Sequence, residues 1–157
     1  MPVSRLRRRP CVWPWRKRKR LPCCSPHALI IGSDQVAELE GMALGKPGTH
    51  ENAVRQLRAM SAKRVVFHTA LCVLDAASGR RQLEMVPTAV QFRALSAAQI
   101  ERYLLREQPY DCAGSAKIES LGVALVQNID SDDPTAIIGL PLMTLITMLQ
   151  REQVYVI

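Results

Sequence analysis

The stretch Ala28-Leu29-Ile30-Ile31-Gly32-Ser33-Asp34-Gln35 marks the beginning of an ordered domain. Residues 28–31 form a short apolar run ended by glycine, which is typical of a buried strand. Residues 32–35 then predict a polar turn at the C-terminal end of that strand. Asp34 would directly follow a buried strand, which is where ligands bind in open α/β sheets. An aspartate at such a place is more often a turn former or a helix cap, so its position alone does not assign it a function.

The residues after Gln35 predict alternating strands and helices. Strands or extended segments are expected over 36–40, 65–74, 82–92 and 121–126, and helices over 49–60, 96–106 and from Pro141 onward. Thr49 can cap the first helix, and Ser96 with Gln99 forms a capping box at the second. Because strands and helices alternate, we expect an α/β fold with a mixed sheet and flanking helices.

The three predicted helices each carry an apolar stripe at helical spacing. The expected buried residues are Ala53, Leu57 and Met60 in the first helix, Ile100, Tyr103 and Leu104 in the second, and Leu142, Leu145, Ile146 and Leu149 in the last. These stripes predict the faces that the helices bury.

The chain joins two compositions near His27. Its 157 residues carry a net charge of +7, but residues 1–26 hold nine of the 21 lysines and arginines and no acidic residue. Residues 27–157 hold 12 basic and 14 acidic residues, a balance of −2. Prolines and self-repelling charge predict that residues 1–26 are disordered, whereas residues 27–157 are expected to form one domain.

Composition also indicates where the protein works. No apolar run approaches the ~20 residues that a membrane-spanning helix needs, so we expect no membrane segment. The basic N-terminal region lacks the apolar stretch of a secretory signal. The five cysteines form no C-x-x-C pair and no disulfide framework, which favours a reducing compartment and hence the cytoplasm.

Two further polar stretches lie in predicted loops, where functional groups concentrate. Gly45-Lys46-Pro47 places a lysine between a flexible and a rigid residue, which suits a point charge that binds a phosphate. Residues 112–119 begin with small residues and then carry Lys117 and Glu119, a cation and an anion two residues apart. Each of these residues taken alone is more often a solvated loop residue, and Lys117 with Glu119 could form a surface ion pair of little value. The pattern alone indicates an α/β domain with a candidate site for an anionic substrate.

Five stretches, in this order and spacing, resemble the Maf family of nucleoside triphosphate pyrophosphatases. They are residues 29–36, Gly45-Lys46-Pro47, residues 52–57, Cys112-Ala113-Gly114-Ser115 with Lys117 and Glu119, and residues 138–142. The resemblance covers about residues 27–152 and implies a Maf/ITPase-like fold. Gln35, Lys117 and Glu119 are similar to the subgroup that acts on 7-methyl-GTP rather than the subgroup that acts on dTTP and UTP.

The resemblance implies hydrolysis of a nucleoside triphosphate between its α and β phosphates, with a divalent metal cation, Mg or Mn. In such an enzyme Asp34 would accept a proton, and would either activate water or help to bind the metal. Lys46 would neutralise the charge that develops on the phosphates.

The resemblance also implies a set of substrate-binding residues. Gln35 and Glu119 would read the base, because a carboxylate near a positively charged methylated guanine gains both a hydrogen bond and charge attraction. Lys117 would bind phosphate or orient Glu119. Ser33, beside Asp34, is assigned to substrate binding as well.

Residues 1–26 depart from the family pattern. Maf proteins begin with a strand and a loop of the form S-x-S-x-R-R, followed by a metal-binding glutamate and a helix with an R-L-A-x-x-K-A pattern, and none of these precedes Ala28. A one-base slip near codons 25–26 permits residues 9–25 to be read as A-L-R-L-A-V-A-K-A-Q-A-L-A-L-L-F, which contains the missing helix pattern. We therefore expect a frame error, a domain without the family's first strand and helix, and little or no pyrophosphatase activity from this chain.

A second hypothesis takes the basic segment as genuine. Nine cations with Trp13 and Trp15 could bind RNA or DNA by phosphate contacts and stacking, in a module that is not an enzyme. The recovery of a family pattern out of frame favours the first hypothesis, so nucleic acid is not the expected partner. We expect a nucleoside triphosphate as the partner and leave open whether the chain forms a homodimer.

Overall fold

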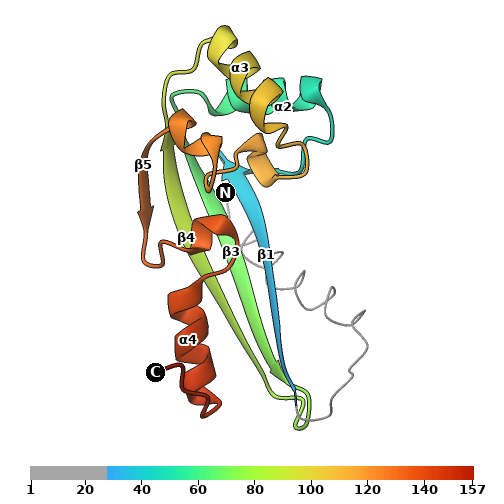
Figure 1. Cartoon of the computed structure of the whole chain (residues 1–157), viewed down its shortest axis with the longest axis vertical. Coiled ribbons are helices and arrows are strands. Elements are labelled where there is room, and N and C mark those ends of the chain that lie inside the picture. The colour runs from blue at the N-terminus through green and yellow to red at the C-terminus, as the bar shows by residue number, and fades with distance from the viewer. Residues whose placement is uncertain (1–27) are drawn as a thin grey trace. The chain divides into compact units, whose positions relative to one another are not determined.

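The computed structural model describes residues 28–157. The strands in this range form a five-stranded sheet in the order β2-β1-β3-β4-β5, and helices accompany them, which confirms the predicted α/β class (Figure 1). Of the described residues, 28–35, His68–Pro87 and Asp132–Ile157 form one compact unit, and Val36–Phe67 with Thr88–Ser131 form a second. The predicted disorder of residues 1–26 lies outside the described residues.

The first unit is built from parts of β1 (Leu29–Leu39), β3 (Arg64–Asp75) and β4 (Arg81–Phe92), together with η3 (Ala136–Ile138) and α4 (Leu142–Arg151). Its core forms where Leu71 and Val73 of β3 pack against Leu145 and Met148 of α4. Leu149 packs against the same cluster, as the apolar spacing predicts.

Within residues 28–157, no helix has the length and apolar character needed to cross a membrane.

The buried face of α4 differs from the predicted stripe. Leu142 and Ile146 were expected to be buried, but they are 45% and 37% exposed. Met148 is fully buried instead. The prediction was wrong at these positions because Leu145 and Met148 are the residues of α4 that pack against β3. The spacing of the apolar residues alone does not show which side of the helix meets the sheet.

A buried aspartate organises the beginning of α4. Asp133 is 2% exposed, and its Oδ1 accepts hydrogen bonds from both the backbone nitrogen and the hydroxyl of Thr135. Its Oδ2 accepts from the backbone nitrogen and the hydroxyl of Thr144, in the first turn of the helix. The Thr135 hydroxyl also accepts from Leu142 N at 2.7 Å. The carboxylate therefore satisfies amide groups that a helix start leaves without partners, and it lies at the favourable end of the helix dipole.

The second unit contains the remaining parts of β1, β3 and β4. It also contains β2 (Met42–Leu44), α2 (His50–Met60), α3 (Ala97–Glu107), η1 (Ala113–Ser115), η2 (Leu121–Leu125) and β5 (Val126–Ser131). Helices α2 and α3 pack against each other in this unit (Figure 1). β4 and β5 pair antiparallel, with Thr88 opposite Ser131.

Helices α2 and α3 begin as the sequence predicts. The Thr49 side chain accepts a hydrogen bond from Asn52 N, and Ser96 forms the predicted reciprocal capping box with Gln99. The predicted apolar stripes are buried in both helices: Ala53, Leu57 and Met60 in α2, and Ile100, Tyr103 and Leu104 in α3. Local capping chemistry and helical period agree here, so the prediction is confirmed.

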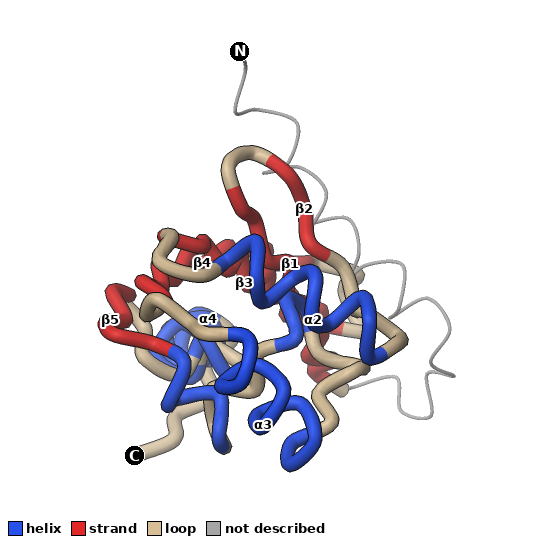
Figure 2. Tube along the Cα trace, turned by 90° about the horizontal axis from the view of Figure 1, so that it is seen from above, coloured by secondary structure: helices blue, strands red, loops and turns tan. Residues whose placement is uncertain are grey.

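The extended continuation is confirmed over 36–39, whereas Glu40 lies in the turn. β1 ends at Leu39 and turns back through Glu40 and Gly41 into β2, as Figure 2 shows. Both turn residues have positive φ, 51° and 84°, which is the backbone of a two-residue type I′ hairpin. The Leu39–Met42 pair closes the turn, and Ala37 lies opposite Leu44.

The predicted polar turn at residues 32–35 is wrong. β1 continues through these residues to Leu39, so Asp34 lies inside the strand and not after it. The strand is also less buried than expected, since Ile31 is 42% exposed. The polar run does not end the strand because Ser33 and Gln35 find hydrogen-bond partners within the first unit.

The strand predicted at 121–126 is wrong as well. Residues 121–125 form the 3₁₀-helix η2, and β5 begins only at Val126. The chain curls there because Ser120 N and Gly122 N both donate to the carbonyl oxygen of Lys117, at 3.1 and 2.9 Å. A Cβ on Gly122 would lie 2.4 Å from that oxygen, so this close approach requires glycine. The apolar spacing of residues 121–126 gives no sign of this backbone contact with Lys117.

Candidate functional site

Ser33 joins β1 to the turn that precedes α4. Its Oγ lies 2.6 Å from the carbonyl oxygen of Gly139 and 3.0 Å from that of Ala70 on β3. The hydroxyl hydrogen can be donated to either oxygen. Two of the five stretches singled out in the sequence, 29–36 and 138–142, are therefore in direct contact in the first unit.

Gln35 makes a second connection to the same region. Its Nε2 donates to the carbonyl oxygens of Ala136 and Ile137, at 2.9 and 3.1 Å, and lies 2.9 Å from the hydroxyl oxygen of Thr69. The Thr69 hydroxyl in turn donates to the Ala136 carbonyl at 2.8 Å. The side-chain nitrogen of Gln35 thus binds the protein's own backbone here, and the reading of a base by Gln35 stays a prediction.

Asp34 lies between Ser33 and Gln35 in the strand. Successive side chains of a strand point to opposite faces, so the carboxylate points away from the face on which its neighbours bind the turn at 136–139. The side chain is half-buried. Its two neighbours fix the backbone on either side, which gives the carboxylate a defined direction.

The Gly45-Lys46-Pro47 stretch forms the loop between β2 and α2. Its backbone is fixed at both ends, because Gly114 N donates to the Gly45 carbonyl at 3.4 Å and Gly48 N donates to the Tyr110 carbonyl at 2.9 Å. Lys46 itself is exposed. A cation on a loop of fixed backbone is suited to bind a phosphate without a large ordering cost.

Gln56 of α2 connects this loop to the segment at 112–115. Its Nε2 donates to the Gly45 carbonyl at 3.0 Å, and its Oε1 accepts from the Ser115 hydroxyl at 2.6 Å. Asn52, one helical turn earlier, donates to the Pro47 carbonyl at 2.9 Å. Three more of the five stretches, 45–47, 52–57 and 112–115, therefore meet within the second unit.

Lys117 forms an ion pair, but its partner is not Glu119. The ammonium nitrogen of Lys117 lies 3.1 Å from Oε1 of Glu107, the last residue of α3. The backbone nitrogen of Lys117 donates to the Tyr103 hydroxyl at 3.0 Å, so both contacts come from α3. Glu119 is exposed. The surface pair between Lys117 and Glu119 that the sequence allowed is replaced by a pair with Glu107.

Glu107 is the centre of this small network. Its Oε2 accepts from the Ser120 hydroxyl at 2.8 Å and from Leu121 N at 3.1 Å. The hydrogen bond from Ser120, followed by that from Lys117, lowers the pKa of Glu107. The hydrogen bond and charge of Glu107 raise the pKa of Lys117. Both groups are therefore charged at neutral pH.

The six predicted site residues divide between the two units. Ser33, Asp34 and Gln35 belong to the first, and Lys46, Lys117 and Glu119 belong to the second. Among residues 28–157, no three histidine, cysteine, aspartate or glutamate side chains form a group that could hold a metal ion. The described residues therefore provide no complete metal cage. Contact between Asp34 and a metal cation stays a prediction.

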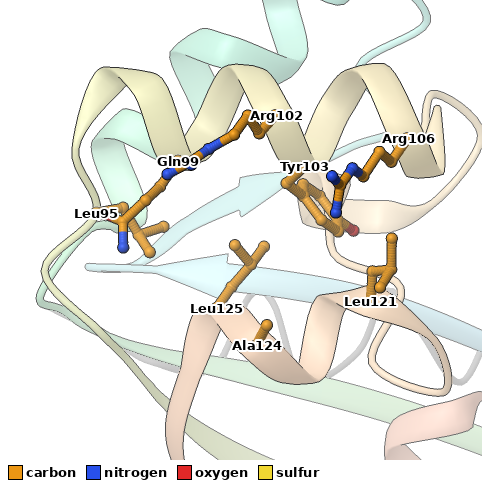
Figure 3. A pocket seen from close by; sticks show the side chains of 8 residues that line it. All are labelled: Leu95, Gln99, Arg102, Tyr103, Arg106, Leu121, Ala124 and Leu125. Carbon is orange, nitrogen blue, oxygen red and sulfur yellow. The ribbon is translucent and has the colours of Figure 1, made fainter.

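A cavity of about 240 Å³ lies between α3 and η2 (Figure 3). Its lining residues are Leu95, Gln99, Arg102, Tyr103, Arg106, Leu121, Ala124 and Leu125. None of the six predicted site residues lines it. It is relevant to the site through Tyr103, whose hydroxyl reaches the backbone of Lys117.

Three residues that organise the site were missed in the sequence. Tyr103 was assigned only to the apolar face of its helix, and Gln56 and Glu107 were assigned no role. Their partners are 10 to 59 residues away in the chain, so no helical or strand spacing could have indicated them. The one available signal was a glutamate at the end of α3, where the helix dipole disfavours a negative charge.

The described residues form an α/β protein in which stretches singled out in the sequence are joined by hydrogen bonds within each unit. The chain belongs to the Maf-like protein family, whose family model matches residues 12–152. The match begins within the basic segment, earlier than the resemblance beginning near residue 27 that was expected from the motifs. The boundary between residues 26 and 27 stays a prediction.

Several relatives are similar over most of the chain, and each is named 7-methyl-GTP pyrophosphatase. The protein of Methylobacillus flagellatus is 58% identical over 132 residues, which cover 84% of this chain and 69% of the relative. The protein of a Polaromonas species is 58% identical over 82% of this chain and 59% of the relative. The protein of Nitrosospira multiformis is 50% identical over 90% of this chain and 71% of the relative. The matches thus span about three fifths to seven tenths of these relatives.

Proposed function

We propose that this protein is a nucleoside triphosphate pyrophosphatase that hydrolyses 7-methyl-GTP, or a related modified nucleoside triphosphate, to the monophosphate and pyrophosphate. With residues 1–26 as they stand, we expect little or no activity. The observation that carries this proposal is its 50–58% identity to relatives named for that reaction, over 82–90% of the chain. The contacts within each unit support it, because they join stretches that carry the resemblance to the family.

Asp34 is proposed as the proton acceptor. A water oxygen attacks the α-phosphorus, the bond from that phosphorus to the oxygen bridging it to the β-phosphorus breaks, and pyrophosphate leaves. The attacking water must lose a proton, and the half-buried Asp34 carboxylate, with its backbone fixed by its neighbours, is suited to accept it. When a divalent cation, Mg or Mn, accompanies the substrate, it would neutralise phosphate charge, and Asp34 is the described residue proposed to contact it.

Lys46 is proposed to stabilise the negative charge that develops on the phosphates. A fixed cation contributes most when it is aimed at charge that grows during the reaction. The backbone contacts of Gly45 and Gly48 provide that fixation, and the exposed lysine side chain leaves room for a phosphate.

Glu119, Gln35, Lys117 and Ser33 are proposed to contribute to substrate binding. Glu119 is the favoured reader of the base, since its exposed carboxylate can attract the positive charge of 7-methylguanine. The donor groups of Ser33 and Gln35 bind backbone carbonyls, which favours a role in orienting β1 around Asp34.

The proposal is tested by pyrophosphate release with magnesium or manganese, using 7-methyl-GTP, GTP, dTTP and UTP as separate substrates. The 157-residue chain is compared with a version in which residues 1–26 are replaced by the frame-repaired and extended family segment. We expect the repaired protein to act fastest on 7-methyl-GTP and this chain to be much slower. A repaired protein that prefers dTTP or UTP would overturn the assigned substrate, and comparable rates for the two proteins would overturn the role given to the missing loop.

The alternative function, a nucleic-acid-binding module, rests on residues 1–26, which lie outside the described residues. The comparisons favour the enzyme, because all the relatives cited above carry an enzyme's name. Binding of RNA by the basic segment would collapse between low and moderate salt and vanish when residues 1–26 are deleted.

A further inference from the structure

We propose that Glu107 is a positioning residue that selects a positively charged base, because it binds the Lys117 ammonium in an ion pair that Glu119 would otherwise form. This inference rests on the proposed function and concerns the same base-recognition segment. Two carboxylates compete for Lys117: one at the end of α3, and one two residues further along the chain. The structure assigns Lys117 to the first of them, with 3.1 Å between Lys117 Nζ and Glu107 Oε1.

The burial of the pair explains this choice. The Glu107 side chain is 7% exposed and that of Lys117 is 41% exposed, whereas Glu119 belongs to the exposed residues. A carboxylate that is largely covered loses little further hydration when it pairs with a lysine. An exposed carboxylate gains little from the same pair, because water screens the attraction.

Glu107 is also prevented from turning away. Its second carboxylate oxygen accepts hydrogen bonds from the Ser120 hydroxyl and from Leu121 N. The backbone of Lys117 is fixed independently by the Tyr103 hydroxyl, which accepts from Lys117 N at 3.0 Å. Figure 3 shows Tyr103 extending from α3 toward the segment that carries Leu121. Helix α3 therefore fixes both ends of the contact between Glu107 and Lys117.

The consequence concerns charge at the base. A 7-methylguanine carries a positive charge that guanine lacks, so a nearby carboxylate distinguishes the two bases only while its own charge is not neutralised. If Lys117 paired with Glu119, the ammonium would cancel that charge and repel the methylated base. Glu107 would thus affect the preference for 7-methyl-GTP over GTP more than it affects the affinity for nucleotide in general.

The test measures the Kd values of the full 157-residue chain for 7-methyl-GTP and for GTP by calorimetry. Glu107→Gln keeps a hydrogen-bond acceptor for Ser120 or Leu121 but removes the charge that binds Lys117. We expect Glu107→Gln to reduce the preference for 7-methyl-GTP by about fivefold, with little change in GTP affinity. This is the range of an exposed ion pair, here the pair that Lys117 would then form with Glu119. Glu101→Gln, on the same helix and paired with His50, is the matched control and is expected to leave the preference unchanged.

A double variant separates this role from a merely structural one. If Glu107 acts through Lys117, Glu107→Gln has no further effect on the preference when Lys117 is replaced by methionine. We also expect Glu107→Gln to lower the Lys117 pKa, as measured by NMR titration of lysine labelled at the ε position. Equal losses of affinity for both nucleotides, or an unchanged preference, would overturn the inference while leaving the proposed function intact. No preference for 7-methyl-GTP in either the 157-residue chain or the frame-repaired protein would overturn the assigned substrate as well.

Discussion

The hydroxyl oxygen of Ser33 lies 2.6 Å from the carbonyl oxygen of Gly139, although 106 residues separate the two in the chain. This contact, with those of Gln35, connects the strand that carries Asp34 to the turn before α4. The polar residues of β1 therefore have a structural role on one face of the strand. That role leaves Asp34, on the other face, as the residue of this stretch best suited to chemistry.

Replacing Ser33 by alanine is expected to destabilise the protein by about 1–2 kcal/mol, because the Gly139 and Ala70 carbonyls lose their donor. The free energy of unfolding in urea measures this loss. Thr147→Ala is the control, since that exposed hydroxyl donates only to the carbonyl of Met143 in its own helix, and we expect a change below about 0.5 kcal/mol. Equal effects of the two substitutions would contradict the role given to Ser33.

Asp133 is expected to make the stability of the protein depend on acid pH. Burial alone would raise its pKa, but hydrogen bonds from Thr144 and Thr135 outweigh burial and lower the pKa below the ordinary value of 3.8. A group with a lowered folded-state pKa contributes stability above its unfolded pKa and loses it as pH falls through the folded pKa. We therefore expect the Asp133 contribution to be complete at neutral pH and to decline below about pH 3.8.

The measurement is urea unfolding of the wild type and of Asp133→Asn between pH 7 and pH 3. Asparagine places a donor where at least one of the four hydrogen bonds needs an acceptor, so we expect a loss of about 1–3 kcal/mol at pH 7. The difference between the two proteins is expected to shrink toward pH 3. A difference that grows on acidification would show that the carboxylate is not stabilised in its charged form.

Substitution by alanine is expected to lower the stability of the protein strongly at Gly122 and to change it little at Gly45. A Cβ at Gly122 would lie 2.4 Å from the Lys117 carbonyl oxygen, so Gly122→Ala must displace backbone and is expected to cost at least about 3 kcal/mol. A Cβ at Gly45 would have nothing within 4 Å, and we expect Gly45→Ala to change stability by less than about 1 kcal/mol. Thermal unfolding of the two variants side by side tests this contrast. Comparable melting temperatures would contradict the close approach at Gly122.

Lys46 is expected to matter for turnover and not for folding. Lys46→Met removes an exposed cation from the fixed loop and is expected to lower kcat/KM for 7-methyl-GTP about 100-fold. Lys63→Met removes an exposed lysine that pairs with Glu40 and is expected to leave kcat/KM within about twofold of the wild type. Both measurements use the frame-repaired protein and pyrophosphate release. A Lys46 variant as active as the Lys63 variant would remove Lys46 from the site.

The sequence predicted those parts of the fold that local chemistry decides. Thr49 and the Ser96–Gln99 box identified two helix starts because a cap lies within three residues of the groups it satisfies. The continuation of β1 through residues 32–35 could not be predicted, because the partner of Ser33 is the distant carbonyl of Gly139. The 3₁₀-helix at residues 121–125 could not be predicted either, because apolar spacing does not reveal that Gly122 N binds the nearby carbonyl of Lys117. In the candidate site the motif residues were visible as a pattern. The ion pair between Lys117 and Glu107 could not be predicted, because it depends on how the end of α3 lies against the segment that carries Lys117.

Asp34 is proposed to accept the proton in the hydrolysis of 7-methyl-GTP. The most direct measurement is single-turnover pyrophosphate release by the frame-repaired protein and by its Asp34→Asn variant, with binding of 7-methyl-GTP measured on both. We expect Asp34→Asn to bind the nucleotide within about threefold of the parent affinity and to lose at least about 100-fold in the rate of release. Release of pyrophosphate at the parent rate would show that Asp34 is not the proton acceptor.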